Sequence, residues 1–432
     1  MSYLDSQRIA TQVLDAHQRT LELIEGLSTE QLMGPVLPII NPLLWEIGHA
    51  AYFYEVWVLR HHLQQSQLID NADNLFDSMT IAHDDRWELP LPTLGETLQY
   101  MQTVLDKVLL SLSEGEDSIR DYLAQYAVFH QDMHNEAYTY TRQTLSYPAP
   151  NMDLLMMKDT VQEGGLSGDV KIPGGTFMLG ATPADGFVFD NEKWAHAVDV
   201  MPFSIAKAAV SNADYLLFVE AGGYKNPEYW DDDGWQWCQL SKLQHPIYWR
   251  SVTQGWEIKQ FDCWKTLPMH SALIHVCWYE AEAYCRWAGR RLPTETEWEV
   301  AAAAEPSTDG LRLSSVKRRY PWGDSSPQAG MANLDSSALG TVDVAAHAAG
   351  DSAFGCRQML GNVWEWTQST FSPYPGFEPD MYKDYSQPLF GKTKVLRGGA
   401  WATGSRIIRN SWRTYYGPER NDVFAGFRTC AQ

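Results

Sequence analysis

Residues 119–143 have the sequence IRDYLAQYAVFHQDMHNEAYTYTRQ, in which apolar residues recur every three or four positions. That spacing is typical of a helix with one face in a protein core. His130 and His134 lie on or beside the apolar face, four positions and therefore about one helical turn apart. Because a buried polar group needs a partner, this stretch predicts a core-facing helix that carries a polar site.

Three earlier segments have the same helical spacing, at residues 9–24, 42–63 and 93–110. Thr93 followed by Glu96 is a capping-box signature, and Pro42 suits the first turn of a helix. Four long amphipathic helices joined by loops predict a four-helix bundle over residues 1–148.

The composition and apolar pattern of the sequence change after residue 148. Glycine, aromatic residues and short β-branched segments dominate, and turn signals outnumber helix signals except at residues 212–221 and 275–304. We therefore expect a linker at 149–168 and an irregular α+β domain at 169–432. The predicted fold class of the whole chain is α plus α+β.

Composition narrows the possible partners and location. The chain has 432 residues, enough for two or three domains, and a formal net charge of −21. So acidic a protein should be repelled by nucleic acid and by anionic membrane surfaces. No apolar run is long enough to span a bilayer and the first residues do not resemble a secretory signal, so we expect a cytoplasmic protein. The six cysteines are far apart and should be reduced, mostly buried thiols.

A third histidine strengthens the case for a metal site. His49, in the run WEIGHAAY, lies near the apolar face of the 42–63 helix. Three imidazoles from two helices would leave up to three open positions on a metal, and all-nitrogen ligation suits Fe(II), Zn or Cu. Glu136 is about 200° around the helix from His134, so it should support a ligand rather than bind the metal. The alternative is that these are core histidines hydrogen-bonded to tyrosines.

Together these features resemble a known family. An H-x3-H-x-E motif, a histidine in W-E-x-G-H and a following glycine- and tryptophan-rich region are similar to the ergothioneine-type sulfoxide synthases and the selenoneine synthases. These enzymes fuse a DinB-like four-helix bundle to a domain of the formylglycine-generating-enzyme fold, which is C-type-lectin-like. The second half contributes PGGTFMLG (173–180), VCWYEAEAYCRWAGRRLPTETEWEVAA (276–302), YPWGD (320–324), GNVWEWT (361–367), VLRGGAWAT (395–403) and DVFAGFRTC (422–430).

The resemblance implies an O2-dependent, non-haem Fe(II) reaction. The imidazole carbon of hercynine (trimethylhistidine) would be joined to the sulfur of a thiol, such as cysteine or γ-glutamylcysteine, to give a sulfoxide in ergothioneine biosynthesis. His49, His130 and His134 match the three iron ligands of the family. An open face on the metal would bring both substrates and oxygen together.

The family also implies roles for residues outside the histidines. A tyrosine donates a proton in family members, and the candidates are Tyr385 and Tyr416, with Tyr382 and Tyr415 as further possibilities. This chain has Met133, Thr414 and Tyr415 at positions where better-known members carry other substrate contacts, so its contacts should differ. Arg86 and Arg420 could bind substrate carboxylates, because an arginine can hold a carboxylate with two parallel hydrogen bonds.

Three other functions stay open. The first is a selenoneine synthase, which takes a selenosugar in place of the thiol. The second is a DinB-type metal-dependent thiol transferase, and the third is a metal-stabilised binding protein without catalysis. The formylglycine-generating enzymes use a pair of copper-binding cysteines near the C-terminus, where this chain offers only Cys430. That departure argues against their activity here.

Overall fold

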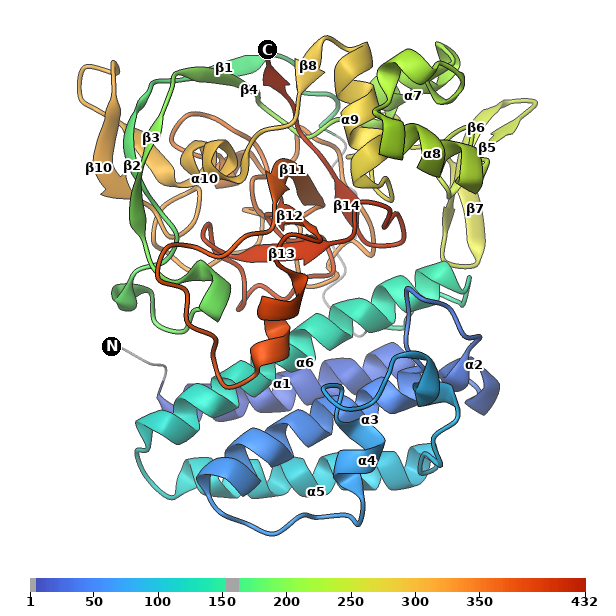
Figure 1. The fold of residues 1–432 in the computed structure, drawn as a ribbon, viewed down its shortest axis with the longest axis vertical. Coiled ribbons are helices and arrows are strands. Elements are labelled where there is room, and N and C mark those ends of the chain that lie inside the picture. Colours follow the sequence, from blue (N-terminus) through green and yellow to red (C-terminus); the bar gives the residue numbers. More distant parts are fainter. Residues whose placement is uncertain (1–4, 153–162) are drawn as a thin grey trace. The chain divides into compact units, whose positions relative to one another are not determined.

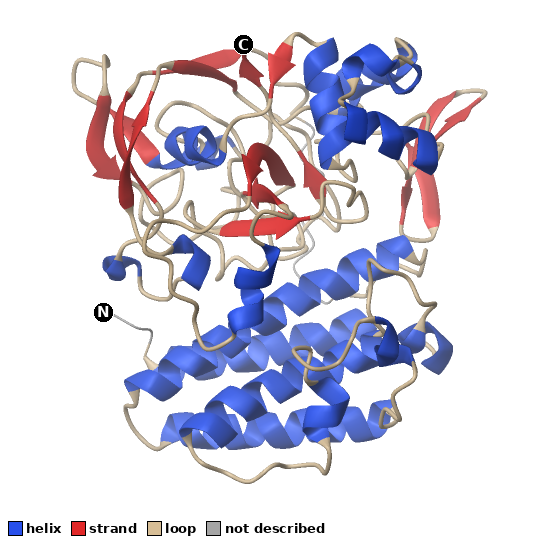
Figure 2. Cartoon of the chain, viewed as in Figure 1, coloured by secondary structure: helices blue, strands red, loops and turns tan. Residues whose placement is uncertain are grey.

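The computed structural model describes residues 5–152 and 163–432. Its contacts divide the chain into two units, Met1–Asp153 and Leu154–Gln432, which we call the helical unit and the C-terminal unit. Helices make up the described secondary structure of the first unit, and all described strands lie in the second (Figure 2). Of the predicted linker at 149–168, residues 153–162 lie outside the described residues.

Four long helices form the helical unit (Figure 1). They are α1 (Ser6–Ile24), α3 (Leu43–Tyr54), α5 (Leu94–Ser113) and α6 (Ser118–Thr144). Short α2 (Thr29–Met33), α4 (Ala72–Phe76) and 3-10 helix η2 (Asp84–Trp87) lie in the connections. α1 packs on α5 and α6, and α3 packs on the same two helices. The four predicted helices are therefore confirmed, while a specific likeness to the DinB bundle stays a prediction.

The helix ends follow from local side-chain chemistry. Thr93 and Glu96 form the predicted capping box, in which each side chain bonds the other residue's backbone N–H. Pro42 was predicted in the first turn of α3, but it is the N-cap, one position before the helix begins. The 42–63 helix has the predicted extent, but its second part is a π-helix, η1 (Glu55–His62). A change from i+4 to i+5 bonding leaves no clear mark on apolar spacing, so the sequence did not reveal it.

The described residues of the C-terminal unit, 163–432, form five small sheets and four α-helices. The first sheet has the order β1 (Asp169–Ile172), β4 (Phe203–Ala206), β15 (Cys430–Ala431) and β8 (Arg290–Arg291). The second has the order β13 (Arg413–Tyr416), β12 (Lys394–Arg397), β11 (Trp364–Thr370) and β14 (Ala425–Gly426). The others pair β2 (Gly175–Leu179) with β3 (His196–Val200), β9 (Ala304–Pro306) with β10 (Leu313–Lys317), and β5 (Trp249–Val252) with β6 (Gly255–Gln260) and β7 (Cys263–Thr266).

The helices of this unit are α7 (Asn212–Glu220), α8 (Asp232–Ser241), α9 (Trp278–Trp287) and α10 (Glu295–Ala303). Short 3-10 turns join them to the strands, among them η4 (Asp190–Glu192) and η8 (Lys383–Tyr385). The helix predicted at 212–221 is confirmed as α7.

The continuous helical region predicted at 275–304 is wrong. It consists of α9 and α10 with strand β8 between them. Gly289, at φ +64°, follows the end of α9 in a conformation that favours glycine. Thr294 then starts α10 as its N-cap, accepting a hydrogen bond from the backbone N–H of Glu297. Both helices carry buried apolar residues, so their apolar spacing continues in the sequence across the break.

Buried ion pairs hold the tryptophan-rich motifs in place. In GNVWEWT the strand-like alternation predicts opposite faces for Trp364 and Glu365, yet both are buried. The Glu365 carboxylate accepts hydrogen bonds from Nε of Arg428 (2.6 Å) and Nε1 of Trp298 (2.7 Å). A charge can lie inside a core when it is paired in this way. The motif therefore acts as scaffold in the C-terminal unit.

All six cysteines are free, and Cys263 is the exposed one, which confirms mostly buried thiols. In the part of the chain that the structure describes, helices of the length and apolarity needed to cross a membrane are absent.

Candidate metal centre

The position of His49 is set by α3 and by the short helix α4. α3 is buried along its whole length, and His49 is only 4% exposed. Its Nδ1 donates a hydrogen bond to the carbonyl oxygen of Phe76 over 2.7 Å. One turn earlier, Nε1 of Trp45 donates to the carbonyl of Leu75, also over 2.7 Å, and the two rings stack with centroids 4.7 Å apart. Nε2 of His49 is therefore the nitrogen left to bind a metal.

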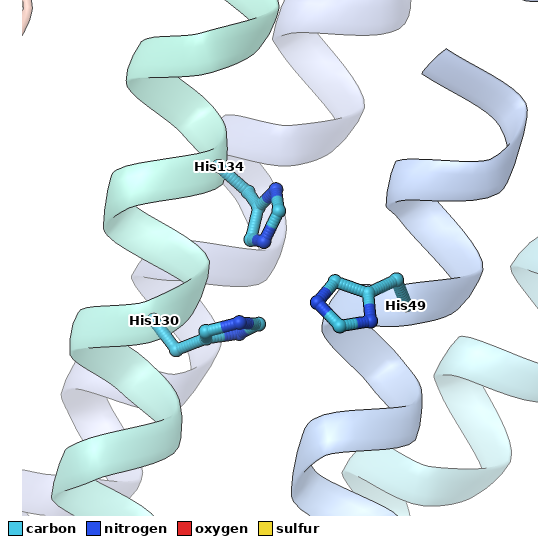
Figure 3. Close-up of side chains that lie close together, drawn as sticks. All are labelled: His49, His130 and His134. Atoms are coloured by element: carbon cyan, nitrogen blue, oxygen red, sulfur yellow. The ribbon is translucent and has the colours of Figure 1, made fainter. Parts of the chain in front are cut away.

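His130 and His134 come from one face of α6 and point toward His49 (Figure 3). Ring centroids lie 4.6 Å apart for His130 and His134, and 5.0 Å apart for each of them and His49. One ligand nitrogen from each residue lies within 4.8 Å of the others. Phe53 stacks on His130 at 3.9 Å. The three imidazoles thus converge inside the helical unit, as the sequence indicates.

Burial keeps the imidazoles in the form that metals bind. Desolvation lowers the pKa of His49 and of His130 well below the usual value, and for both the charge of His134 acts in the same direction. Neutral rings offer a lone pair, whereas protonated rings do not. His49 and His130 are almost fully buried and His134 is partly exposed, so the open side of the group lies at His134.

This donor set fits a first-row divalent metal. Three imidazole nitrogens at this spacing can share one ion and leave further positions open, which suits Fe(II), Zn or Cu. The alternative of three core histidines bonded to tyrosines predicts hydrogen bonds to phenols. His49 and His130 stack instead on the rings of Trp45 and Phe53, and Nδ1 of His49 bonds a backbone carbonyl.

A carboxylate that sequence reasoning missed lies beside His134. Oε1 of Glu46 is 3.4 Å from Nδ1 of His134, and Glu46 is 3% exposed. The signal was present in the sequence, because Glu46 is the one carboxylate of α3, a helix buried along its whole length, and a buried charge needs a partner. Glu136 is also buried but lies outside the three-histidine group, and its predicted supporting role stays a prediction.

Arg86, predicted as a carboxylate clamp, lies close to this site in η2. Its guanidinium is stacked over Trp45, 4.1 Å from the ring centroid, and its Nη1 donates to Oδ1 of Asn41 over 2.5 Å. Its positive charge contributes to the lowered pKa of His49. Met133, beside His134 on α6, is partly exposed. The structure therefore brings two predicted substrate residues near the histidines, within one unit.

The predicted catalytic tyrosines fall into two separate groups within the C-terminal unit. Tyr385, in η8, stacks on Phe189 at 4.6 Å, and its ring lies 6.0 Å from that of Tyr415. Burial raises the pKa of Tyr385 above its usual range, while a hydrogen bond with Trp412 opposes the shift. Burial likewise raises the pKa of Tyr415 well above its usual value. Both phenols are therefore protonated at neutral pH.

Tyr416 belongs to the second group. Successive residues of a strand point to opposite faces, so Tyr416 and Thr414 share one face of β13 and Tyr415 the other. The guanidinium of Arg420 lies 5.3 Å from the ring centroid of Tyr416. The Nε and Nη2 edge of Arg420 is held by both oxygens of Asp422, at 2.6 and 2.7 Å. A substrate carboxylate would have to use another edge of this guanidinium.

Comparisons with known proteins agree with the motifs. Residues 155–432 match the family model of the sulfatase-modifying factor enzyme 1-like domain. The chain is 37% identical to a hercynine oxygenase of Mycolicibacterium thermoresistibile over 431 residues, covering 97% of this chain and 94% of that one. A hercynine oxygenase of Mycolicibacterium smegmatis is 34% identical, with 98% of both chains covered.

A formylglycine-generating enzyme of Thermomonospora curvata is 30% identical over 314 residues, which cover 65% of this chain and 99% of that enzyme. In the C-terminal unit, Cys430 is fully buried, and burial raises its pKa to about 12. Such a thiol is part of the core rather than an available metal ligand. Because the matches to hercynine oxygenases extend over nearly the whole chain, helical unit included, the chain belongs to the hercynine oxygenase family of enzymes.

Proposed function

We propose that the protein is a non-haem Fe(II), O2-dependent oxidoreductase that acts on hercynine. It would join the imidazole carbon of hercynine to the sulfur of a thiol, such as cysteine or γ-glutamylcysteine, and form a sulfoxide on the route to ergothioneine. The observation that carries the proposal is the group of three histidine nitrogens within 4.8 Å of one another in a chain of this family. One oxygen atom of O2 would go to the sulfur, and the other would leave as water with the two displaced hydrogens.

The residues of the helical unit support this chemistry by holding the metal in a dry site. His49, His130 and His134 would bind iron, which when bound supplies open positions where both substrates and oxygen can meet. Trp45 and Phe53 stack on two of the ligand rings and exclude water from them. The phenylalanine and tryptophan faces also limit rotation of the rings, so the open positions keep one orientation.

The C-terminal unit would supply a proton. We assign the donor to Tyr385 or Tyr416; burial raises the pKa of Tyr385, so its Oη keeps a proton at neutral pH. A neutral phenol can give up this proton to a reduced oxygen species without first carrying a charge into an apolar pocket. Substrate contacts from Arg86, Met133, Thr414, Tyr415 and Arg420 are also proposed, as is a cytoplasmic location.

The test is anaerobic loading of the full chain with Fe(II), followed by oxygen-uptake assays with hercynine and a panel of thiol and selenol donors. We expect uptake only when hercynine and a thiol are both present, with a sulfoxide product identified by its mass. Uptake confined to a selenosugar donor would instead support a selenoneine synthase. Thiol consumption without oxygen uptake would support a DinB-type thiol transferase and contradict the proposal.

A further inference from the structure

The pair formed by Glu46 and His134 has unused hydrogen-bonding capacity. The 3.4 Å between Oε1 and Nδ1 is longer than a normal N–H···O hydrogen bond. Nδ1 of His134 and Oε2 of Glu46 are both buried and make no hydrogen bond with the described part of the chain. Buried polar atoms in this state are costly, so the arrangement favours any event that closes the gap.

Other residues hold the carboxylate at this place. Nδ2 of Asn41 donates to Oε1 of Glu46 over 2.9 Å, and Asn41 is itself held by Arg86. Arg86 also packs on Trp45, which stacks on His49. One arginine is therefore connected to two ligand histidines, through Asn41 and Glu46 on one side and through Trp45 on the other. The carboxylate is therefore preorganised close to Nδ1 of His134.

We propose that Glu46 is the positioning residue of His134. When a metal binds Nε2 of His134, the ring is fixed with Nδ1–H donating to Glu46, and the negative carboxylate makes the imidazole a stronger donor to the metal. His49 already has the equivalent bond, from its Nδ1 to the Phe76 carbonyl. The two ligands would thus be supported differently, one by a neutral carbonyl and the other by a charge. This inference rests on the metal site of the proposed function.

The experiment is a titration of the metal-free full chain with Co2+, followed by the visible d–d absorption of the bound ion. The variants are Glu46→Gln and Glu46→Ala, and circular dichroism checks that each one folds. We expect Glu46→Gln to bind Co2+ roughly 10-fold more weakly and Glu46→Ala up to roughly 100-fold more weakly. Both should shift the absorption bands, because the donor strength of His134 changes. The glutamine rescues part of the loss since it keeps an acceptor without the charge.

Glu55 provides a matched control. It is fully buried, follows α3 directly, and is bonded to Tyr100 and to the backbone N–H of Leu68. Glu55→Gln therefore removes a buried carboxylate charge from the same continuous helix, and we expect the Co2+ affinity and spectrum of the wild type.

Several outcomes would overturn the inference. Wild-type affinity and spectrum in both Glu46 variants would remove any role for this carboxylate. Complete loss of binding in a folded Glu46→Gln protein would make Glu46 a ligand. A larger effect from Glu136→Gln would move the role to that residue. If Glu46→Ala does not fold, the nearly isosteric glutamine variant decides the question. A wild-type protein that binds Co2+ but turns over no hercynine would contradict the proposed function and leave the role of Glu46 intact.

Discussion

The carbonyl oxygen of Phe76 accepts a hydrogen bond from Nδ1 of His49 over 2.7 Å. Because a carbonyl can only accept, the proton is on Nδ1, and Nε2 carries the lone pair that points into the three-histidine group. Phe76 is the last residue of α4, a helix of five residues. The orientation of a candidate ligand on a long helix is therefore fixed by the backbone of a short one.

Loss of a ligand histidine should abolish metal binding. We expect His130→Ala and His134→Ala to lose stoichiometric Fe(II), because two remaining nitrogens from two helices cannot hold the ion with comparable affinity. Iron content after anaerobic loading measures this, and circular dichroism should show an intact fold. His61→Ala is the control. His61 is exposed, so this variant should bind iron as the wild type does. Full iron occupancy in His134→Ala would contradict the three-histidine site.

Gly48→Ala should weaken metal binding without touching a ligand. A Cβ at Gly48 would lie 2.1 Å from Cε1 of Phe76, so the Phe76 ring must move. We expect this shift to disturb the Phe76 carbonyl that holds His49. We expect at least a several-fold loss of Co2+ affinity, and a free energy of unfolding lower by about 1–3 kcal/mol from overpacking.

The matched control for this substitution is Gly95→Ala. Gly95 lies in the first turn of α5, and a Cβ there would have no neighbour within 4 Å. It should leave metal affinity unchanged and should not destabilise the fold, because alanine is the better helix former. Equal affinity in the Gly48 and Gly95 variants would show that the Phe76 contact does not orient His49.

Variants of Arg86 separate a substrate clamp from a structural support. Lysine keeps the charge but loses the planar group that stacks on Trp45 and reaches Asn41. We expect Arg86→Lys to lower Co2+ affinity several-fold. Arg60→Lys, which changes an arginine paired with Asp73, should not. A raised KM for the thiol donor at unchanged metal affinity would instead assign Arg86 to the substrate carboxylate.

Tyr385→Phe tests the proton donor. We expect a loss of turnover of about 10²- to 10⁴-fold with normal iron content, because a general acid is removed and the ring packing is kept. Since burial raises the pKa of Tyr385 above 10, its ionisation should produce no decline in wild-type turnover below that pH. A loss confined to Tyr416→Phe would transfer the role to Tyr416.

The sequence predicts the histidine group well because helical periodicity determines which face of a long helix is buried. His130 and His134 follow from the apolar spacing of α6, and His49 from that of α3. The residues that support these histidines were harder to predict from the sequence. α4 is too short to show a period. The bond from Asn41 to Glu46 depends on the loop conformation just before α3, which apolar spacing does not describe.

In the C-terminal unit, apolar spacing predicts the structure less well than in the helical unit. Its family motifs identify the domain. Apolar spacing alone, however, predicts one helix where the structure has α9 and α10. The same spacing assigns Glu365 to one face of a strand but does not show that Glu365 is buried. The bonds of Glu365 to Arg428 and Trp298 join residues more than sixty positions apart in the chain. Periodicity describes local structure only, so such pairings become visible only in the folded protein.

The three histidines lie on two helices that are far apart in the sequence, so an unfolded chain does not contain the assembled site. A metal that binds only the folded form adds to its stability, by about 2.7 kcal/mol at a free concentration 100 times the dissociation constant. The melting temperature of the helical unit should therefore rise with metal concentration. Calorimetry could then rank the affinities of variants that have no turnover, and a chelator should lower the thermal resistance of the native protein.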